Sequence, residues 1–223
     1  MSFEHGILLF ALVCGFYMAW SIGANDVANA MGTSVGSGAL TLRRAVVIAA
    51  VLEFSGAYFF GGNVTQTVQK GIINTEMFQG QPQVLVVGMI AALIAAGAWL
   101  QLASYFGWPV STTHSIIGAL VGFGAVVGGV EAVHWGSVGS IVLSWIFSPF
   151  LGGIISFLLF TLIRRQIFYS PHPLKIARRL MPYLAAFVVF FLVMVVFSKG
   201  LKRMNLQIGF LETFLISFAI GAL

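Results

Sequence analysis

Seven long apolar segments, separated by short polar connections, run along this chain. They cover residues 6–30, 44–61, 83–105, 110–129, 136–163, 181–198 and 206–223. A helix needs roughly 20 apolar residues to cross a bilayer, and these segments approach or exceed that length. They do not alternate as the strands of a membrane barrel do, and helices satisfy their own backbone groups in lipid. The pattern predicts an all-α integral membrane protein, a polytopic helix bundle.

The connections differ in character. Residues 62–82 are polar and rich in Gly, Asn and Gln, and they predict a loop that Pro82 closes. Residues 164–180 carry five basic side chains and the sequence SPHP, which predicts an extended, proline-stiffened connector. The sequence SPFLGG within 136–163 predicts a kink or a loosened turn in that helix.

Composition supports a membrane protein. Hydrophobic residues make up 59% of the 223 positions and charged residues only 8%, against about a quarter charged in soluble domains. The net charge of +5 lies in clusters between the apolar segments, which indicates anchoring at the membrane surface and not a nucleic-acid surface. The single cysteine excludes an intrachain disulfide. No Lys or Arg precedes the first segment, so it lacks a signal-peptide n-region and is expected to stay in the protein.

Basic residues give two possible orientations. Arg43 and Arg44 place the end of the first helix inside and the N-terminus outside. If 110–129 crosses the membrane, the basic residues of 164–179 also lie inside. If it is a re-entrant hairpin, the basic residues of 199–203 lie inside instead. A crossing would place five basic residues inside and a hairpin would place three, so the count favours the crossing.

The first unusual segment is GANDVANAMG, residues 23–32, near the end of the first apolar run. Its glycines each cost roughly 1 kcal/mol in a helix relative to alanine, and Asn25, Asp26 and Asn29 are poor interior helix residues. We therefore expect the first helix to be broken here. A carboxylate in the membrane needs water, a cation or a basic partner, and its oxygens with those of the two amides suit sodium. The alternative is that the helix ends near residue 22 and the motif is an aqueous loop.

The second unusual segment is FGWPVSTTHSIIGALVGFG, residues 106–124. Pro109 suits a first helical turn, and Ser111, Thr112 and Thr113 are cap-type residues. The free N–H groups of a helix N-terminus attract an anion, to which the hydroxyls can donate. His114 could donate as well, or carry a proton. The alternative is ordinary capping of a surface helix.

Glu53 is the only acidic residue of the second apolar segment and lies near its centre. An acid in the membrane is expected to act as a cation ligand or proton carrier, the alternative being a neutral acid that is hydrogen-bonded to a neighbouring helix. Together the three features describe a cation site beside an anion site on interrupted helices, which is typical of a coupled anion transporter.

GANDVANAMGTSVGSGALT and PVSTTHSIIGALVGFG resemble the signature segments of the PiT family of inorganic phosphate transporters. AAVLEFSGAYFFGGNVTQTVQKGI and SKGLK resemble the family in the same order, so the resemblance covers nearly the whole chain. It implies secondary transport of inorganic phosphate coupled to sodium ions or protons, with no cofactor and no enzyme activity. It also implies phosphate contacts from Asn25 and Asp26 and, at the tip of a re-entrant hairpin, from Ser111, Thr112, Thr113 and His114. Asp26, Asn29 and Glu53 are implied as cation-binding or coupling residues, with Asp26 and Asn29 as sodium ligands.

The family consists of two inverted repeats, each with a discontinuous first helix and a re-entrant hairpin. This chain contains one GANDVANA-like segment and one such hairpin. We therefore expect residues 1–203 to be the N-terminal repeat and 204–223 to begin the connection to a second repeat. The expected partners are phosphate, a sodium ion or proton, the lipid bilayer, and a second repeat or a homodimer partner. The short loops favour a bacterial inner membrane.

Three other functions fit parts of this pattern. Hydroxyls and a helix N-terminus do not select phosphorus, so a permease for another oxyanion such as sulfate is possible. Ser111 and His114 lie three residues apart, as an intramembrane hydrolase could use, but no third residue orients His114 and no G-x-S-x-G sequence is present. A non-transporting membrane subunit is the third possibility. The residues do not decide between sodium and protons.

Overall fold

The computed structural model describes residues 3–200 and 209–222, which are almost entirely helical. It consists of two compact units, 1–139 and 140–223. Each of the seven apolar segments contains an α-helix, so the predicted all-α membrane fold is confirmed. Among the described residues, the helices long and apolar enough to cross a membrane are Glu4–Gly36, Pro82–Tyr105, Trp135–Phe168 and Pro173–Ser198. The chain is therefore an integral membrane protein.

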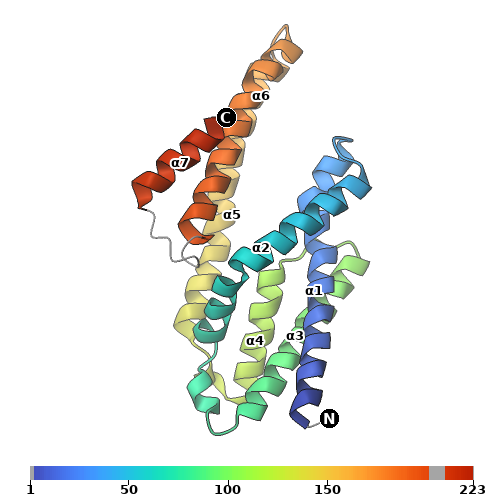
Figure 1. Cartoon of the computed structure of the whole chain (residues 1–223), viewed down its shortest axis with the longest axis vertical. Coiled ribbons are helices and arrows are strands. Elements are labelled where there is room, and N and C mark those ends of the chain that lie inside the picture. The colour runs from blue at the N-terminus through green and yellow to red at the C-terminus, as the bar shows by residue number, and fades with distance from the viewer. Residues whose placement is uncertain (1–2, 201–208, 223) are drawn as a thin grey trace. The chain divides into compact units, whose positions relative to one another are not determined.

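The first unit contains four helices, shown with their packing in Figure 1. They are α1 (Phe3–Gly36), α2 (Leu42–Gly71), α3 (Pro82–Tyr105) and α4 (Thr112–Val127). Two single 3-10 turns, η1 (Thr75–Phe78) and η2 (Val130–Ala132), follow α2 and α4. Helix α3 packs against both α1 and α4, while α2 packs against α1. The hairpin of α3 and α4 is thus held against α1 through α3.

Glycines allow α3 to approach its neighbours closely. A Cβ added at Gly97 would lie 2.8 Å from Cε1 of Tyr17 and 3.4 Å from Cα of Met18, both on α1. A Cβ at Gly88 would overlap the ring of Phe123 on α4. Close approach at small residues is the usual way in which helices associate in lipid.

Helix α1 is continuous from Phe3 to Gly36, so the predicted break at 23–32 was wrong. The asparagines there bond to each other and to a neighbouring turn, as described below, so their side chains do not compete for the backbone of their own helix. The helix ends only at the next glycines. Gly38 has φ +76°, in the left-handed region, and its N–H donates to the Val35 carbonyl over 3.0 Å.

Helix α2 reaches Gly71, so the predicted loop 62–82 is helical over its first half. The remaining connection is anchored by Ile72 and Ile73, which are 2% and 1% exposed. Ile73 forms an antiparallel bridge with Val133, which follows α4. The end of α2 and the end of α4 are therefore tied together.

The second unit begins within α5 (Trp135–Ile163), which stays helical on both sides of Pro149, so the predicted loosening does not interrupt it. A π-helical turn, η3 (Arg164–Phe168), precedes α6 (Pro173–Val195). The predicted extended connector 164–180 was therefore wrong over most of its length, because 164–168 continue the helix and α6 begins at Pro173, a proline that suits a first helical turn. A second π-helical turn, η4 (Val196–Gly200), and helix α7 (Phe210–Ala222) follow.

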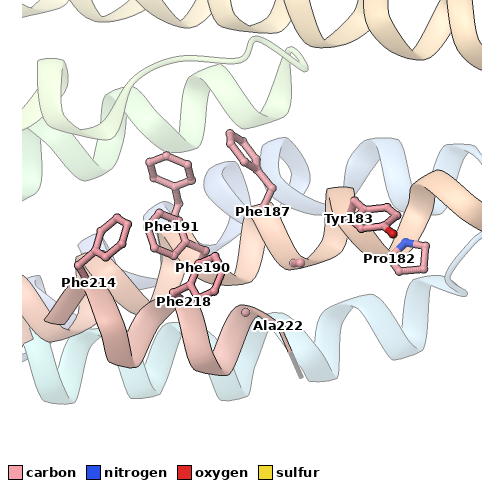
Figure 2. A pocket seen from close by; sticks show the side chains of 10 residues that line it. Pro182, Tyr183, Phe187, Phe190, Phe191, Phe214, Phe218 and Ala222 are labelled. Carbon is pink, nitrogen blue, oxygen red and sulfur yellow. The ribbon is translucent and has the colours of Figure 1, made fainter. Parts of the chain in front are cut away.

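Helix α7 packs against α6 along a row of small buried residues at four-residue spacing, Thr213, Ser217 and Gly221. A Cβ at Gly221 would lie 2.9 Å from the backbone oxygen of Ala186 on α6. Aromatic side chains of both helices line a cavity of about 630 Å³ beside this contact, shown in Figure 2. Within it, Phe190 and Phe214 meet edge to face with their ring centroids 5.4 Å apart.

Some predictions fall on residues 201–208, which lie outside the described residues. These are the boundary between 203 and 204, the start of the segment 206–223, and the placement of Lys202 and Arg203.

Candidate functional site

The candidate site lies where α1 meets the turn between α3 and α4. This turn has a defined geometry at the end of α3. Gly107 has φ +68°, its N–H donates to the Ser104 carbonyl over 3.1 Å, and the Trp108 N–H donates to the Ala103 carbonyl over 2.8 Å. This pair of bonds is a Schellman motif, which satisfies the last carbonyls of α3 and requires a residue such as glycine at the left-handed position.

Ser111 begins α4 as its N-cap. Its backbone is extended, with φ −85° and ψ 121°, and its Oγ accepts a hydrogen bond from the His114 N–H over 3.3 Å. The Ser115 hydroxyl donates to the Ser111 carbonyl over 2.9 Å. Ser111 thus has the capping role that its residue type favours, and the hydroxyls of the next two residues are not needed for that role.

Asn25 fastens α1 to the turn. Its side chain is only 4% exposed, and its Nδ2 donates to the Trp108 carbonyl over 3.3 Å. The Asn29 Nδ2 donates to the Asn25 Oδ1 over 3.1 Å, one helical turn away. The two amides of the motif therefore form a chain from α1 to the backbone of the turn.

Asp26 and Thr112 join the two unusual sequence segments. The Thr112 Oγ1 donates to the Asp26 Oδ2 over 3.3 Å, and both side chains are half-buried. The carboxylate therefore lies beside the N-terminus of α4, where backbone N–H groups and hydroxyls also lie. The structure thus brings Asn25, Asn29 and Asp26 together with Thr112, while their roles as cation and phosphate ligands stay predictions.

Glu53 lies on α2 with an exposed side chain, close enough to Asp26 for the two acids to interact electrostatically. Thr113 and His114 are exposed in the first turn of α4. Their role as phosphate contacts stays a prediction.

The residues present offer oxygen ligands rather than a transition-metal site. In the part of the chain that the structure describes, no three His, Cys, Asp or Glu side chains come together. The carboxylate of Asp26, the amide oxygen of Asn29 and the carboxylate of Glu53 are of the type that sodium prefers to nitrogen or sulfur. A proton on either acid would supply the same charge compensation.

Sequence reasoning missed two contributors to this region. One is the Trp108 carbonyl, because a backbone acceptor in a turn carries no sequence signal. The other is the hydrogen bond from the Tyr17 hydroxyl to Gln101, which ties α1 to α3. Gln101 could have been found, since it is an isolated amide in the apolar segment 83–105.

Comparison with known proteins gives one consistent family. The phosphate transporter family matches residues 22–221. The chain is 58% identical over 177 residues to an Arabidopsis thaliana protein named inorganic phosphate transporter 2-1, chloroplastic, covering 79% of this chain and 30% of that protein. It is 53% identical over 194 residues to a Chlamydia pneumoniae protein named as a candidate phosphate permease, covering 87% of this chain and 46% of that one.

A solved structure, described as the sodium-dependent phosphate transporter, superimposes on this chain with a TM-score of 0.86 and 44% identity. The match covers 97% of this chain and 52% of that structure. The chain therefore spans about half the length, or less, of the relatives it matches. The matching family is one of transporters and not of enzymes, which removes the support for a hydrolase built on Ser111 and His114.

Proposed function

Since this chain belongs to the phosphate transporter family, we propose that it is the N-terminal half of a transporter that moves inorganic phosphate together with sodium. Phosphate contacts come from Asn25, Asp26 and the first turn of α4, with Ser111, Thr112, Thr113 and His114. Asp26, Asn29 and Glu53 bind or couple the cation, and Asp26 and Asn29 are the sodium ligands.

The hydrogen bond between Thr112 and Asp26 is the observation that carries this proposal. It puts a carboxylate next to the positive end of a helix whose first turn is rich in hydroxyls. Such a helix end favours an anion by its free N–H groups and by its dipole. The same place therefore offers a carboxylate for a cation and N–H and hydroxyl groups for an anion.

Their closeness gives a physical reason for coupling. A phosphate beside α4 and an ionised Asp26 are like charges, and at about 5 Å and an effective dielectric constant near 20 they repel by about 3 kcal/mol. A sodium ion on Asp26 removes that repulsion, which corresponds to roughly a hundredfold in phosphate affinity. By linkage, bound phosphate strengthens sodium binding by the same factor.

The re-entrant hairpin belongs to this proposal as α3 and α4. Helix α4 has 16 residues, about 24 Å at 1.5 Å per residue, which is shorter than the roughly 30 Å hydrocarbon core. The bridge between Ile73 and Val133 ties the end of α4 to the connection that leads into α3. The bridge fixes α3 and α4 as an antiparallel hairpin, and the short length of α4 favours a tip, residues 106–111, that lies within the membrane.

The other half of the proposed site comes from a second inverted repeat or from a homodimer partner. Residues 1–203 form the first repeat, and 204–223 begin the connection to the second. This proposal is supported by relatives about twice the length of the chain. A bacterial inner membrane is the proposed location, supported by the short connections between the helices.

Sodium is preferred to protons because a structure 44% identical to the chain is described as sodium-dependent. Another tetrahedral oxyanion such as sulfate is the second candidate substrate, since the hydroxyls and N–H groups of α4 recognise oxygen atoms. The third candidate, a non-transporting subunit, is less well supported, because it gives no functional reason for the contact between Asp26 and Thr112.

Uptake of radiolabelled phosphate into proteoliposomes tests the proposal. The chain is reconstituted alone and joined to the second half of a relative, with a sodium gradient, a proton gradient or neither. We expect uptake by the joined protein, driven by sodium and undiminished by excess sulfate outside. Inhibition by sulfate would favour the second candidate, proton-driven uptake would exclude sodium coupling, and no uptake under any gradient would contradict transport.

A further inference from the structure

The second unit carries a strongly basic surface at the end where α5 is connected to α6. Its members are the exposed side chains of Arg164, Arg165, Lys175, Arg178 and Arg179. The π-helical turn η3, which contains the first two, packs against α6, which contains the other three. We call these five residues the basic cap.

No acidic residue in this unit can balance the basic cap from nearby in the sequence. Between Glu131 and Glu212 the chain contains no Asp or Glu at all. Glu212, at the start of α7, accepts a hydrogen bond from the Gly209 N–H over 3.1 Å. Within the described residues of this unit, the five positive charges therefore have no acidic side chain close in sequence to balance them, and an anion from outside can bind there.

The position of three of these cations at the start of α6 also favours binding of an anion. Lys175, Arg178 and Arg179 lie in the first two turns, where the helix dipole is positive and cations are unfavourable. Their spacing of three and four residues places them on one face of the helix. His172, the N-cap residue, gives no side-chain cap to the first turn, so an anion there would meet free N–H groups as well as cations.

The surroundings of the basic cap are those of a membrane surface. The candidate spans Trp135–Phe168 and Pro173–Ser198 both end at it. Large exposed apolar side chains flank the cations, namely Phe168, Tyr169, Leu174 and Met181. Arg164 lies over the Tyr169 ring, with Cζ 5.5 Å from the centroid, as expected where an aromatic belt meets the headgroup layer.

We propose that the basic cap binds the phosphodiester headgroups of anionic phospholipids and so holds the α5–α6 connection at the membrane surface. A hollow of about 450 Å³, lined by Pro171, His172, Pro173, Leu174 and Lys175, lies at the start of α6 and gives a headgroup room beside the cations. A cluster of four or more Lys and Arg beside a membrane span attracts the anionic headgroups of the leaflet that it faces. This inference is independent of the proposed transport site, which lies in the first unit.

Lipid selectivity of the reconstituted chain tests the inference. The chain is placed in phosphatidylcholine vesicles with trace spin-labelled phosphatidylglycerol or spin-labelled phosphatidylcholine, and the motionally restricted fraction is measured by electron paramagnetic resonance. We expect phosphatidylglycerol to be preferred. Since each cation near an anionic surface contributes roughly fivefold, Arg178→Gln/Arg179→Gln should lower that preference by about tenfold or more.

Two further variants separate a site from general charge. Arg43→Gln/Arg44→Gln removes the same charge from the exposed start of α2 and should keep the preference. Arg178→Lys/Arg179→Lys should keep it too, whereas equal loss in this variant would indicate damage to the fold and overturn the inference. An unchanged preference in Arg178→Gln/Arg179→Gln, or equal loss in the α2 variant, would also overturn it. Displacement of the labelled lipid by millimolar inorganic phosphate, but not by sodium chloride of equal ionic strength, would assign the cap to free phosphate instead.

Discussion

Thr112 on α4 donates a hydrogen bond to Asp26 on α1 over 3.3 Å, across 86 residues of sequence. This contact joins the N-terminus of α4 to the only aspartate of the chain. The carboxylate proposed to hold the cation therefore lies beside the helix N-terminus proposed to hold the anion.

Removing the Thr112 hydroxyl should impair transport without unfolding the protein. Thr112→Val keeps the shape of the side chain and loses the hydrogen bond to Asp26, so uptake by the transporter that contains both halves should fall about tenfold or more, as expected for a hydrogen bond to a charged group. Thr112→Ser keeps the hydroxyl and should retain most of the activity. Equal uptake by the valine and serine variants, measured with radiolabelled phosphate, would remove the hydroxyl from the account.

The two asparagines of the motif should differ in their effect on stability. Asn25 is buried and holds the Trp108 carbonyl, so Asn25→Ala should lower the free energy of unfolding by about 1–3 kcal/mol. Asn29 is exposed, and Asn29→Ala should change it by about 0.5 kcal/mol or less. Thermal unfolding in detergent measures both, and a reversed order would contradict the role of Asn25 as the fastening between α1 and the turn.

Much of the fold was predictable because length and apolarity decide it. Each of the seven apolar segments forms a helix, and Ser111 caps α4 as its residue type indicates. Helix ends were less predictable. Residues 62–71 are polar yet extend α2, because polarity of a segment does not by itself end a helix.

The break predicted in α1 failed for a different reason. Propensity counts the cost of Gly23, Gly32 and the asparagines within their own helix. It cannot include tertiary partners such as the Trp108 carbonyl, which accepts from Asn25 across 83 residues. The residues of the site were thus recognisable from the sequence, while the bonds between them were not.

Neutralising Glu53 should abolish gradient-driven uptake with little effect on folding. Its side chain is exposed and interacts electrostatically with Asp26, so Glu53→Gln alters the charge that the cation balances but breaks no buried contact. Glu76→Gln, at an exposed acid in η1, is the matched control and should keep normal uptake. Normal uptake by Glu53→Gln would remove this residue from the mechanism.

The close packing of α7 against α6 should require a glycine at position 221. A larger side chain would meet the Ala186 carbonyl oxygen, and backbone cannot move aside as a flexible side chain can. We expect Gly221→Val to lower the free energy of unfolding by about 1–3 kcal/mol. Gly152→Val, at a position on α5 with open space around its Cα, should change it by about 0.5 kcal/mol or less. Thermal unfolding of the two variants gives the comparison, and equal stability would mean that α7 does not pack as described.

The most direct test of the coupling is equilibrium phosphate binding by Asp26→Asn. The purified protein contains this chain and the second half, and affinity is measured with sodium and with a large inert cation in its place. If sodium acts by neutralising Asp26, the unsubstituted protein binds phosphate roughly a hundredfold more tightly in sodium. The variant, already neutral at that position, then binds phosphate with the same affinity in both media. A variant that keeps the full sodium dependence would contradict the account, because the cation would then act somewhere other than at Asp26.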